Sequence, residues 1–180
     1  MLVLAAASTF PPGHSTTRLC LELLAETLAK EPCPQLLDVG CGSGVLLLAG
    51  VAAGARVGVG LDLSLRAVST TRNNARANGL ATAVQVVRGS TECLRGPFGM
   101  MVANLPWAVQ MDKVAEFTRL AAPETCLILS GFKDTQEEEL RGRYESAGWV
   151  LENRLTRDEW VIELPPEKSY TWVAWRFRRG

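Results

Sequence analysis

A glycine-rich loop flanked by two acids is the part of this sequence best suited to hold a ligand. The stretch LLDVGCGSGVL places Gly40, Gly42 and Gly44 between two apolar runs. Asp38 stands two residues before the first glycine, and Asp62 ends the next apolar run. Glycines let a backbone approach a ligand closely, whereas a carboxylate attracts positive charge and accepts hydrogen bonds. The stretch therefore predicts a ligand that carries both hydroxyl groups and a cation.

The loop differs from the GxGxxG pattern of dinucleotide-binding proteins, because the third glycine of that pattern would fall at Val45. Asp38 would repel a pyrophosphate, but it would attract an ammonium or sulfonium group. Asp62 follows the loop by about 20 residues, where nucleotide-binding α/β proteins hold an acid that accepts hydrogen bonds from ribose. Either acid alone would be read as a helix cap or a turn residue. Together, a ribose at Asp62 and a cationic amino-acid portion near Asp38 describe S-adenosylmethionine.

The tetrapeptide NLPW (104–107), directly after the apolar run 98–104, is a second candidate site. The Asn104 side-chain oxygen and the Leu105 carbonyl are hydrogen-bond acceptors, while Pro106 stiffens the turn and has no N–H to donate. Trp107 offers an aromatic face for a planar base or a cationic chain. In isolation the tetrapeptide would be a strand-ending turn with a core tryptophan. Its position behind the glycine loop favours a site that holds the methyl acceptor.

The tetrapeptide suits a nitrogen acceptor better than oxygen or carbon. Oxygen and carbon acceptors usually need a base to remove a proton, and the sequence has no Cys/His or Asp/His arrangement placed for this role. A neutral amine needs only placement beside the methyl donor. For a lysine, whose unperturbed pKa is ~10.4, reaching the free amine at pH 7 costs roughly 4 to 5 kcal/mol. Neutral Asn104 would not add to that cost as an aspartate would.

Strand-like and helix-like segments alternate along the chain, and these must position both sites. Helices are predicted over 15–30, 44–54, 64–79, 108–121 and 134–148, with Ser15, Ser64 and Asp134 as capping residues. Strands are predicted over 35–40, 56–62, 83–89, 98–104, 125–131, 149–164 and 169–179. The last two flank PPEK and indicate a hairpin. The pattern predicts an α/β fold: a Rossmann-like, seven-stranded, mostly parallel sheet with helices on both faces and a C-terminal antiparallel hairpin.

The 180 residues, 47% of them hydrophobic, are enough for one substantial core. We expect a single domain over 1–180, in which 1–30 form a loop and helix over the cofactor site and 35–180 form the core. Nineteen basic and nineteen acidic residues cancel, so no net field draws the protein to nucleic acid or lipid, and any such contact must be local. The arginines at 176, 178 and 179 read as a solvated chain end.

The five cysteines show no CxxC spacing, which argues against a zinc site or a disulfide framework and favours reduced thiols in the cytoplasm. We expect no bound metal. The opening MLVLAAAS lacks the basic residues of a signal peptide and reads as the entry to the fold. No segment approaches the ~18 uninterrupted apolar residues of a membrane span, so no membrane partner is expected.

The motif DVGCGSG resembles that of the class I S-adenosylmethionine-dependent methyltransferases, and the resemblance covers almost the whole chain. It implies that S-adenosylmethionine is the cofactor and is held by Asp38, Gly40, Cys41, Gly42, Gly44 and Asp62. The residue after the third strand of that family lies near the adenine and is often an acid, whereas here it is Ser90. NLPW is similar to the [DN]PP[FYW] motif of amine methyltransferases. That similarity implies that Asn104 contacts both cofactor and acceptor, and that the Leu105 carbonyl helps to orient the acceptor.

The leader FPPGHSTTRLCLELL (10–24) is similar to the one that precedes the core of the PrmA-type methyltransferases of ribosomal proteins. His14, Thr16 and Thr17 match its His-x-Thr-Thr run, which implies that both threonines cover the cofactor. The later stretches LILSGFKDTQEEELRGRYESAGW and RDEWV are also similar. The chain departs from that family in its prolines at 11 and 12, in starting close to His14 without the substrate-gripping N-terminal domain, and in the Pro-Trp of NLPW.

These observations predict a methyltransferase that acts on a protein amine, such as a lysine of a ribosomal protein. One alternative is an RNA or DNA base methyltransferase, which the proline and tryptophan of NLPW favour and the zero net charge disfavours. Another is a non-catalytic, cofactor-binding partner subunit. For His14, the only histidine, a capping role and a substrate-orienting role stay equally open. The sequence does not specify the oligomeric state.

Overall fold

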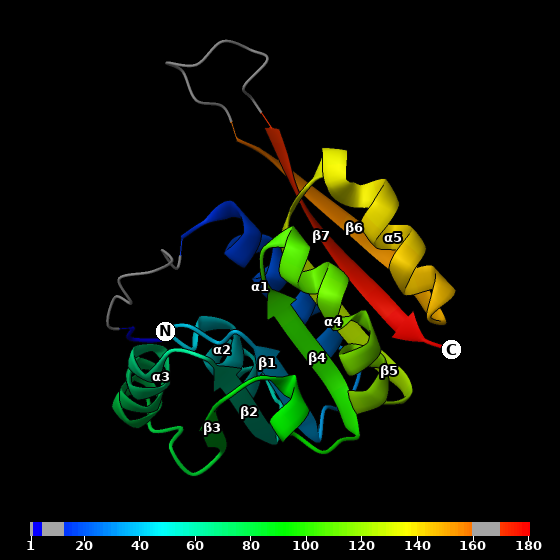
Figure 1. Cartoon of the computed structure of the whole chain (residues 1–180). Helices are drawn as coiled ribbons and strands as arrows, with labels where there is room; N and C mark the ends of the chain where they lie inside the picture. The colour runs from blue at the N-terminus through cyan, green and yellow to red at the C-terminus, as the bar shows by residue number, and fades with distance from the viewer. Residues whose placement is uncertain (1, 5–12, 160–169) are drawn as a thin grey trace.

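The computed structural model describes residues 2–4, 13–159 and 170–180 and contains one seven-stranded sheet in the order β3-β2-β1-β4-β5-β7-β6 (Figure 1). Its strands are β1 (Gln35–Val39), β2 (Val57–Asp62), β3 (Val84–Arg88), β4 (Phe98–Asn104), β5 (Ala121–Lys133), β6 (Trp149–Glu159) and β7 (Tyr170–Arg179). Strands β1 to β5 pair in parallel, while β7 runs antiparallel to both β5 and β6. The predicted fold class and the antiparallel C-terminal pair are confirmed, although the PPEK turn lies outside the described residues.

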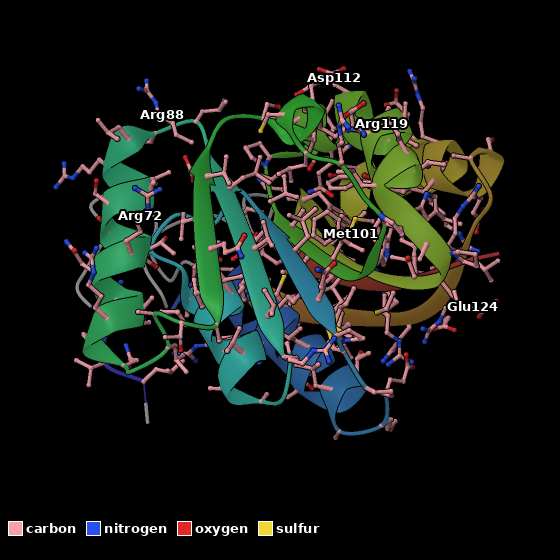
Figure 2. All side chains as sticks on the ribbon, turned by 90° about the horizontal axis from the view of Figure 1, so that it is seen from below. Arg72, Arg88, Met101, Asp112, Arg119 and Glu124 are labelled. Atoms are coloured by element: carbon pink, nitrogen blue, oxygen red, sulfur yellow. The ribbon has the colours of Figure 1, made fainter. Side chains whose placement is uncertain are left out.

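Within the described residues, five α-helices cover the two faces of the sheet (Figure 1). They are α1 (Ser15–Leu28), α2 (Val45–Ala52), α3 (Leu65–Ala77), α4 (Trp107–Leu120) and α5 (Glu137–Ser146). Alternate side chains of β4 point to opposite faces: Met100 and Val102 pack with α1, whereas Met101 and Ala103 pack with α4 and α5. Figure 2 shows Met101 in the middle of the molecule, where it is fully buried. Burial on both faces explains why the central strands read as continuous apolar runs.

Of the three predicted capping residues, only Ser64 is confirmed, since its hydroxyl accepts the N–H of Ala67 at 3.3 Å. Ser15 is already helical. The cap of α1 is His14, whose ring nitrogen Nδ1 accepts the backbone N–H of Thr16 at 3.3 Å. An imidazole nitrogen is as good an acceptor as a hydroxyl, and the chain turns one residue earlier than predicted.

Asp134 does not form the predicted capping box with Glu137. It begins a short 3-10 turn, η2 (Asp134–Gln136), and its own carboxylate accepts the N–H of Thr135 at 2.9 Å. The side chain that reaches back to the start of the turn is that of Gln136, which accepts the N–H of Lys133 at 3.0 Å. The helix therefore begins after a tighter turn than the sequence indicated.

The C-terminal arginines are not a solvated chain end, because β7 lies between β5 and β6. Arg178 forms ion pairs with Glu31 at 2.6 Å and Glu152 at 3.1 Å, and Arg176 lies 3.2 Å from Glu152. The Arg179 guanidinium donates to a backbone carbonyl at 2.5 Å. Because β7 is an interior strand, these long side chains extend along the surface of the sheet, and their guanidinium groups reach glutamates or a backbone carbonyl.

The order of the strands defines where a ligand can bind. Strand β1 has β2 on one side and β4 on the other. The strand order therefore reverses beside β1: β2 and β3 follow on one side of it, and β4 and β5 on the other. In open α/β sheets ligands bind at the carboxyl ends of the strands beside such a reversal. The glycine loop follows β1, Asp62 ends β2 and NLPW follows β4, so both candidate sites open onto this one place.

Trp175 of β7 provides a test of the packing. Its fully buried ring lies 4.4 Å from that of Phe132, centroid to centroid, and its indole N–H donates to Glu137 at 2.9 Å. Trp175→Ala should lower the free energy of unfolding in urea by about 3 to 5 kcal/mol, since it leaves a cavity in the core. Val150→Ala on neighbouring β6, where Val150 is 59% exposed, should change it by less than about 0.5 kcal/mol. Equal effects of the two substitutions would contradict this account.

Candidate functional site

The glycine loop takes a conformation that only glycine adopts without strain. Gly40, Gly42 and Gly44 have φ angles of 77°, 55° and 82°. A Cβ atom on Gly44 would lie 2.7 Å from a methyl carbon of Thr71, whose hydroxyl donates to the Gly42 carbonyl at 3.0 Å. The N–H groups of Gly40 and of the next residue both donate to the Leu61 carbonyl, at 2.9 and 3.0 Å. The loop is thus attached to the end of β2 and to helix α3.

Asp62 joins the loops that follow β1 and β2. Its Oδ2 accepts the N–H of Gly42 at 3.0 Å, and its Oδ1 accepts the N–H of Ser64 at 2.9 Å. A carboxylate has about four lone-pair sites, so two remain for further donors. The side chain is half-buried at the carboxyl end of the sheet. Asp62 can therefore organise the glycine loop and accept hydrogen bonds from vicinal hydroxyls.

Asp38 is only 1% exposed, and its Oδ2 accepts the N–H of Leu47 in the first turn of α2 at 3.0 Å. Burial raises the pKa of this carboxyl to about 7, although the Leu47 hydrogen bond opposes the shift; the nearby charge of Asp62 raises it further. The ionised and protonated forms of Asp38 are therefore similarly populated near pH 7. A cation bound next to it would favour the ionised form.

The loop after β4 is held against the end of β5. The Leu105 N–H donates to the Ser130 carbonyl at 3.0 Å, and the Gln110 amide donates to the carbonyls of Leu105 at 2.6 Å and Ser130 at 2.8 Å. Gly131 has φ 104°, and a Cβ atom there would collide with the Leu105 carbonyl. Gln110 is fully buried on α4 and was missed from the sequence. The one available signal was a polar amide in the first turn of a helix after a proline.

Three distant segments meet at this point. The Leu105 side chain lies over the glycine loop, since a Cβ atom on Gly40 would be 2.5 Å from its Cδ2. The Asn104 amide donates to the Thr17 hydroxyl at the start of α1 at 3.3 Å. The glycine loop, NLPW and the start of α1 are therefore in contact, as the sequence analysis expected.

Unpaired polar atoms gather in the same segment. Among the described residues, Asn104 Oδ1, Trp107 Nε1 and Gln110 Oε1 are buried and have no hydrogen-bond partner. Buried polar groups are nearly always paired in native proteins, so such a group indicates a ligand or an ordered water. Because Asn104 Oδ1 is an acceptor beside the glycine loop, it can receive an N–H from a ligand.

Trp107 differs from the expectation of an open aromatic face. It begins α4 and packs against the core cluster formed with α4 and α5. Pro106 precedes it in the N-cap position and is exposed; its carbonyl accepts the N–H of Val109 at 3.0 Å and that of Gln110 at 3.2 Å. Proline and tryptophan thus define the turn and the first helical residue.

Thr16 and Cys41 direct their side chains inward. The Thr16 hydroxyl is buried 2.9 Å from the His14 ring, which also packs edge-on against Trp172 at 5.2 Å between centroids. His14 therefore has the capping role in this structure. The Cys41 thiol lies 3.5 Å from the Thr71 hydroxyl, and burial raises its pKa to about 12, so it stays neutral. Only backbone atoms of Cys41 are left to contact a ligand.

Ser90 follows β3, and its hydroxyl accepts a hydrogen bond from Lys113 of α4 at 2.9 Å. Lys113 also forms an ion pair with Glu92 at 2.5 Å and lowers the pKa of that carboxyl. Glu92 therefore places an acid two residues after Ser90. The sequence analysis did not single out Glu92 or Lys113.

In the part of the chain that the structure describes, no three His, Cys, Asp or Glu side chains lie close enough to hold a metal ion. None of the helices within these residues is long and apolar enough to cross a bilayer. All five cysteines are free thiols, and four of them are buried.

Comparison with known proteins gives one family. The family model described as "Ribosomal protein L11 methyltransferase (PrmA)" matches residues 9–164. Proteins of that name from Gloeobacter violaceus and Syntrophotalea carbinolica are 39% and 35% identical over 151 and 162 residues. These alignments cover 82% and 89% of this chain but only 46% and 53% of the relatives. The chain therefore spans about half the length of the curated relatives it matches.

Solved structures share the fold. A ribosomal protein L11 methylase from Lactobacillus delbrueckii subsp. bulgaricus superposes with a TM-score of 0.80 at 21% identity, over 93% of this chain and 81% of that one. Magnesium protoporphyrin IX methyltransferase from Synechocystis PCC 6803, solved with bound S-adenosylmethionine, gives 0.66 at 18% identity, over 89% and 78% of the two chains. Both confirm the Rossmann-like methyltransferase fold.

The buried carboxyl of Asp38 predicts a pH dependence of stability. Its folded-state pKa of about 7 lies above the value of about 3.9 for a free aspartate, so the folded protein binds more protons than the unfolded chain between these values. The contribution of Asp38 therefore falls as pH rises from about 4 to about 7, by at most about 4 kcal/mol, and is constant above pH 7. Urea unfolding of wild type minus that of Asp38→Asn should follow this curve. A difference that does not change with pH would refute the assignment.

Proposed function

Because the chain belongs to the ribosomal protein L11 methyltransferase family, we propose that it transfers the methyl group of S-adenosylmethionine to an amine nitrogen of a ribosomal protein. The observation that carries the proposal is the contact between the glycine loop and the NLPW loop, with the buried oxygen of Asn104 left unpaired between them. The name of the curated relatives supports the substrate class. The bound cofactor of the Synechocystis methyltransferase supports the choice of methyl donor.

The donor set at the carboxyl ends of β1 and β2 fits this cofactor. Asp62 keeps lone pairs for the two ribose hydroxyls, and the open conformation of Gly40, Gly42 and Gly44 brings backbone close to the amino-acid portion. Asp38 compensates positive charge there. We propose that Thr16, Thr17, Ser90 and Asn104 border the same place; the Asn104 amide donates to the Thr17 hydroxyl at 3.3 Å. When bound, S-adenosylmethionine supplies an electrophilic methyl group on a positively charged sulfur.

Asn104 is proposed to orient the acceptor. Its buried Oδ1 accepts an N–H of the incoming neutral amine and so directs the nitrogen lone pair toward the methyl carbon. The Leu105 carbonyl already accepts a hydrogen bond from Gln110 and has a second lone pair for the amine. A neutral amide does not stabilise the ammonium form of a lysine, as a carboxylate would. The proton must leave before transfer, and no step requires a base in contact with the methyl group.

The alternatives lose support at particular residues. A planar nucleic-acid base would need a free aromatic face, and half-buried Trp107 has part of its ring packed against the core. We further propose that residues 1–180 act as one methyltransferase domain in the cytoplasm, to which the reduced state of its cysteines is suited. A non-catalytic partner subunit stays an alternative that activity of the purified chain excludes.

Calorimetry with S-adenosylmethionine and S-adenosylhomocysteine tests the cofactor site. Asp62→Ala removes a charged acceptor of two hydroxyls and loosens the glycine loop, so both dissociation constants should rise by at least about 30-fold, equivalent to about 2 kcal/mol. Glu139→Ala on exposed α5 removes the same charge and should leave them unchanged within about twofold. Failure of wild type to bind either compound, or unchanged binding by Asp62→Ala, would remove the proposal.

Methyl transfer to purified ribosomal protein L11 tests the acceptor site. Asn104→Ala should retain cofactor binding within about fivefold but lower kcat by about 10²- to 10³-fold, the usual effect of losing one orienting group. Asn73→Ala, an exposed amide on α3, is the matched control and should leave kcat unchanged. Protease and nuclease digestion of labelled cell extract then identifies the acceptor class. Label released by nuclease alone would favour the base methyltransferase instead.

A further inference from the structure

The charges of this neutral protein are unevenly distributed along the chain. The segment 56–88, which contains β2, α3 and β3, carries five arginines, no lysine and a single acid, Asp62. Asp62 belongs to the neighbouring strand β2. Helix α3 and strand β3 carry Arg66, Arg72, Arg76 and Arg88 and contain no acid. We call these four residues the arginine face. Figure 2 shows Arg72 and Arg88 on the outer side of the molecule, at the edge formed by α3 and β3.

The arginine face has no internal charge compensation. All four side chains are exposed, and none of them lies within 4.0 Å of a carboxylate belonging to residues 2–4, 13–159 or 170–180. The arginines at 119, 141, 154, 176 and 178 each pair with a glutamate. Other described arginines are also unpaired, but α3 and β3 carry four of them with no acid between them. A local positive potential is therefore concentrated at this edge although the net charge is zero.

The geometry groups the four cations. At 100° per helical residue, Arg66, Arg72 and Arg76 lie within about 120° of the helix circumference, and the last two are one turn apart. Arg88 extends the face to the carboxyl end of β3, where it is the register partner of Asp62. The arginine face thus extends from helix α3 to the end of β3, at the rim of the candidate active site.

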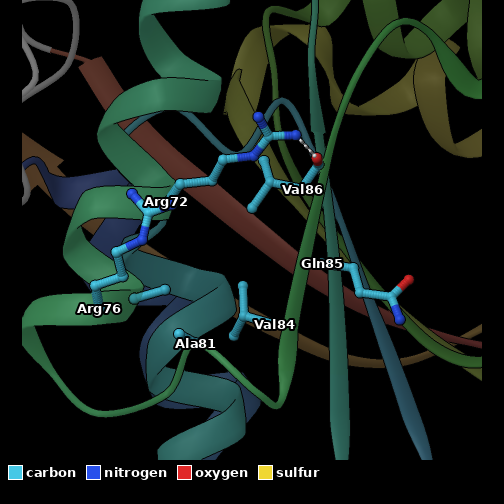
Figure 3. Close-up of a pocket in the computed structure, with 7 residues that line it drawn as sticks. Arg72, Arg76, Ala81, Val84, Gln85 and Val86 are labelled. Carbon is cyan, nitrogen blue, oxygen red and sulfur yellow. Dashed lines mark hydrogen bonds between the residues drawn. The ribbon is translucent and has the colours of Figure 1, made fainter.

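A groove of about 290 Å³ lies between α3 and β3 and is lined by Arg72, Arg76 and Gln85, among others (Figure 3). The Arg72 guanidinium donates to the Val86 carbonyl of β3 at 2.7 Å, which fixes its direction and leaves its remaining N–H groups for a ligand. Arg76 is anchored on Asn73 at 3.1 Å. Anchored guanidinium groups lose less conformational entropy on binding than free ones.

The chemistry of the arginine face favours phosphate groups of RNA. Guanidinium groups match phosphate in a bidentate way, and α3 presents Arg72 and Arg76 one turn apart. An extended acidic peptide would add to the sheet edge, but Arg72 already occupies a carbonyl of that edge at Val86. Helix α3 and strand β3 contain no aromatic residue on which bases could stack. Contacts are thus restricted to the backbone.

We propose that the arginine face binds the phosphate backbone of RNA without regard to base sequence. This interaction goes beyond methyl transfer and needs no cofactor, so it can fail or hold independently of the proposed function. An RNA strand on this face would extend from the α3–β3 groove to the rim beside Asp62. A methyl acceptor that is itself associated with RNA would thereby be brought to the NLPW loop.

Fluorescence anisotropy of the full chain with a labelled single-stranded RNA of 20 nucleotides tests the proposal. The double variant Arg66→Glu, Arg76→Glu leaves Arg72 and its strand contact in place and should weaken binding at least 10-fold. It should also reduce the slope of log Kd against log salt by about 1.4, at about 0.7 for each phosphate that is no longer neutralised. The matched control Arg143→Glu, Arg157→Glu changes the charge equally at exposed arginines of α5 and β6, and should stay within about twofold. Thermal unfolding of both variants checks that they fold.

Several results would overturn the proposal. These are absence of RNA binding by wild type at 50 mM salt, equal weakening by both double variants, or a change of more than about fivefold when the RNA sequence is exchanged. Vesicles containing phosphatidylserine and a polyglutamate peptide serve as competing probes. If either binds through Arg66 and Arg76 while RNA does not, the partner is a lipid surface or an acidic protein instead.

Discussion

The site depends on how the loop after β4 is attached to the end of β5. Two carbonyls, of Leu105 and Ser130, share the single amide of Gln110, and the absence of a side chain at Gly131 lets the two strands approach. A side-chain amide is suited to this position because it donates two hydrogen bonds from one nitrogen. The loop is held from behind, and its buried Asn104 oxygen has no hydrogen-bond partner among the described residues. Rigid attachment of this kind is what a reaction that needs only placement requires.

The two acids of the glycine loop have different environments and therefore different behaviour. Asp62 is half-buried and satisfied by two backbone N–H groups, so it holds the loop and still accepts hydrogen bonds. Asp38 has one such partner in a dry interior, and burial raises its pKa to about 7. A sulfonium or ammonium group near Asp38 would offset part of the cost of its charge. A cationic ligand thus fits the interior better than a neutral or anionic one.

Charge is arranged differently at the two edges of the sheet. At the β6 edge, Arg154, Arg176 and Arg178 pair with glutamates of neighbouring elements. At the β3 edge, the arginine face has no such partners among the described residues. Surface ion pairs stabilise the fold slightly, whereas the repulsion between unpaired like charges lowers its stability. An uncompensated cluster that reaches the rim of the active site is accordingly more easily explained by a ligand than by folding.

The sequence by itself determined the elements of this protein and their order, because strand alternation, helical periodicity and positive φ at Gly40, Gly42 and Gly44 depend on neighbouring residues alone. It also placed both candidate sites at the carboxyl ends of the parallel strands, since the loops that follow β1, β2 and β4 all lie at that end of the sheet. Side-chain directions were decided only by the tertiary structure. Trp107 packs, half-buried, against the core, and the buried Gln110, which no local pattern singled out, holds the acceptor loop. Such partners come from segments distant along the chain, and short-range spacing does not encode which of them will meet when helices cover the two faces of the sheet.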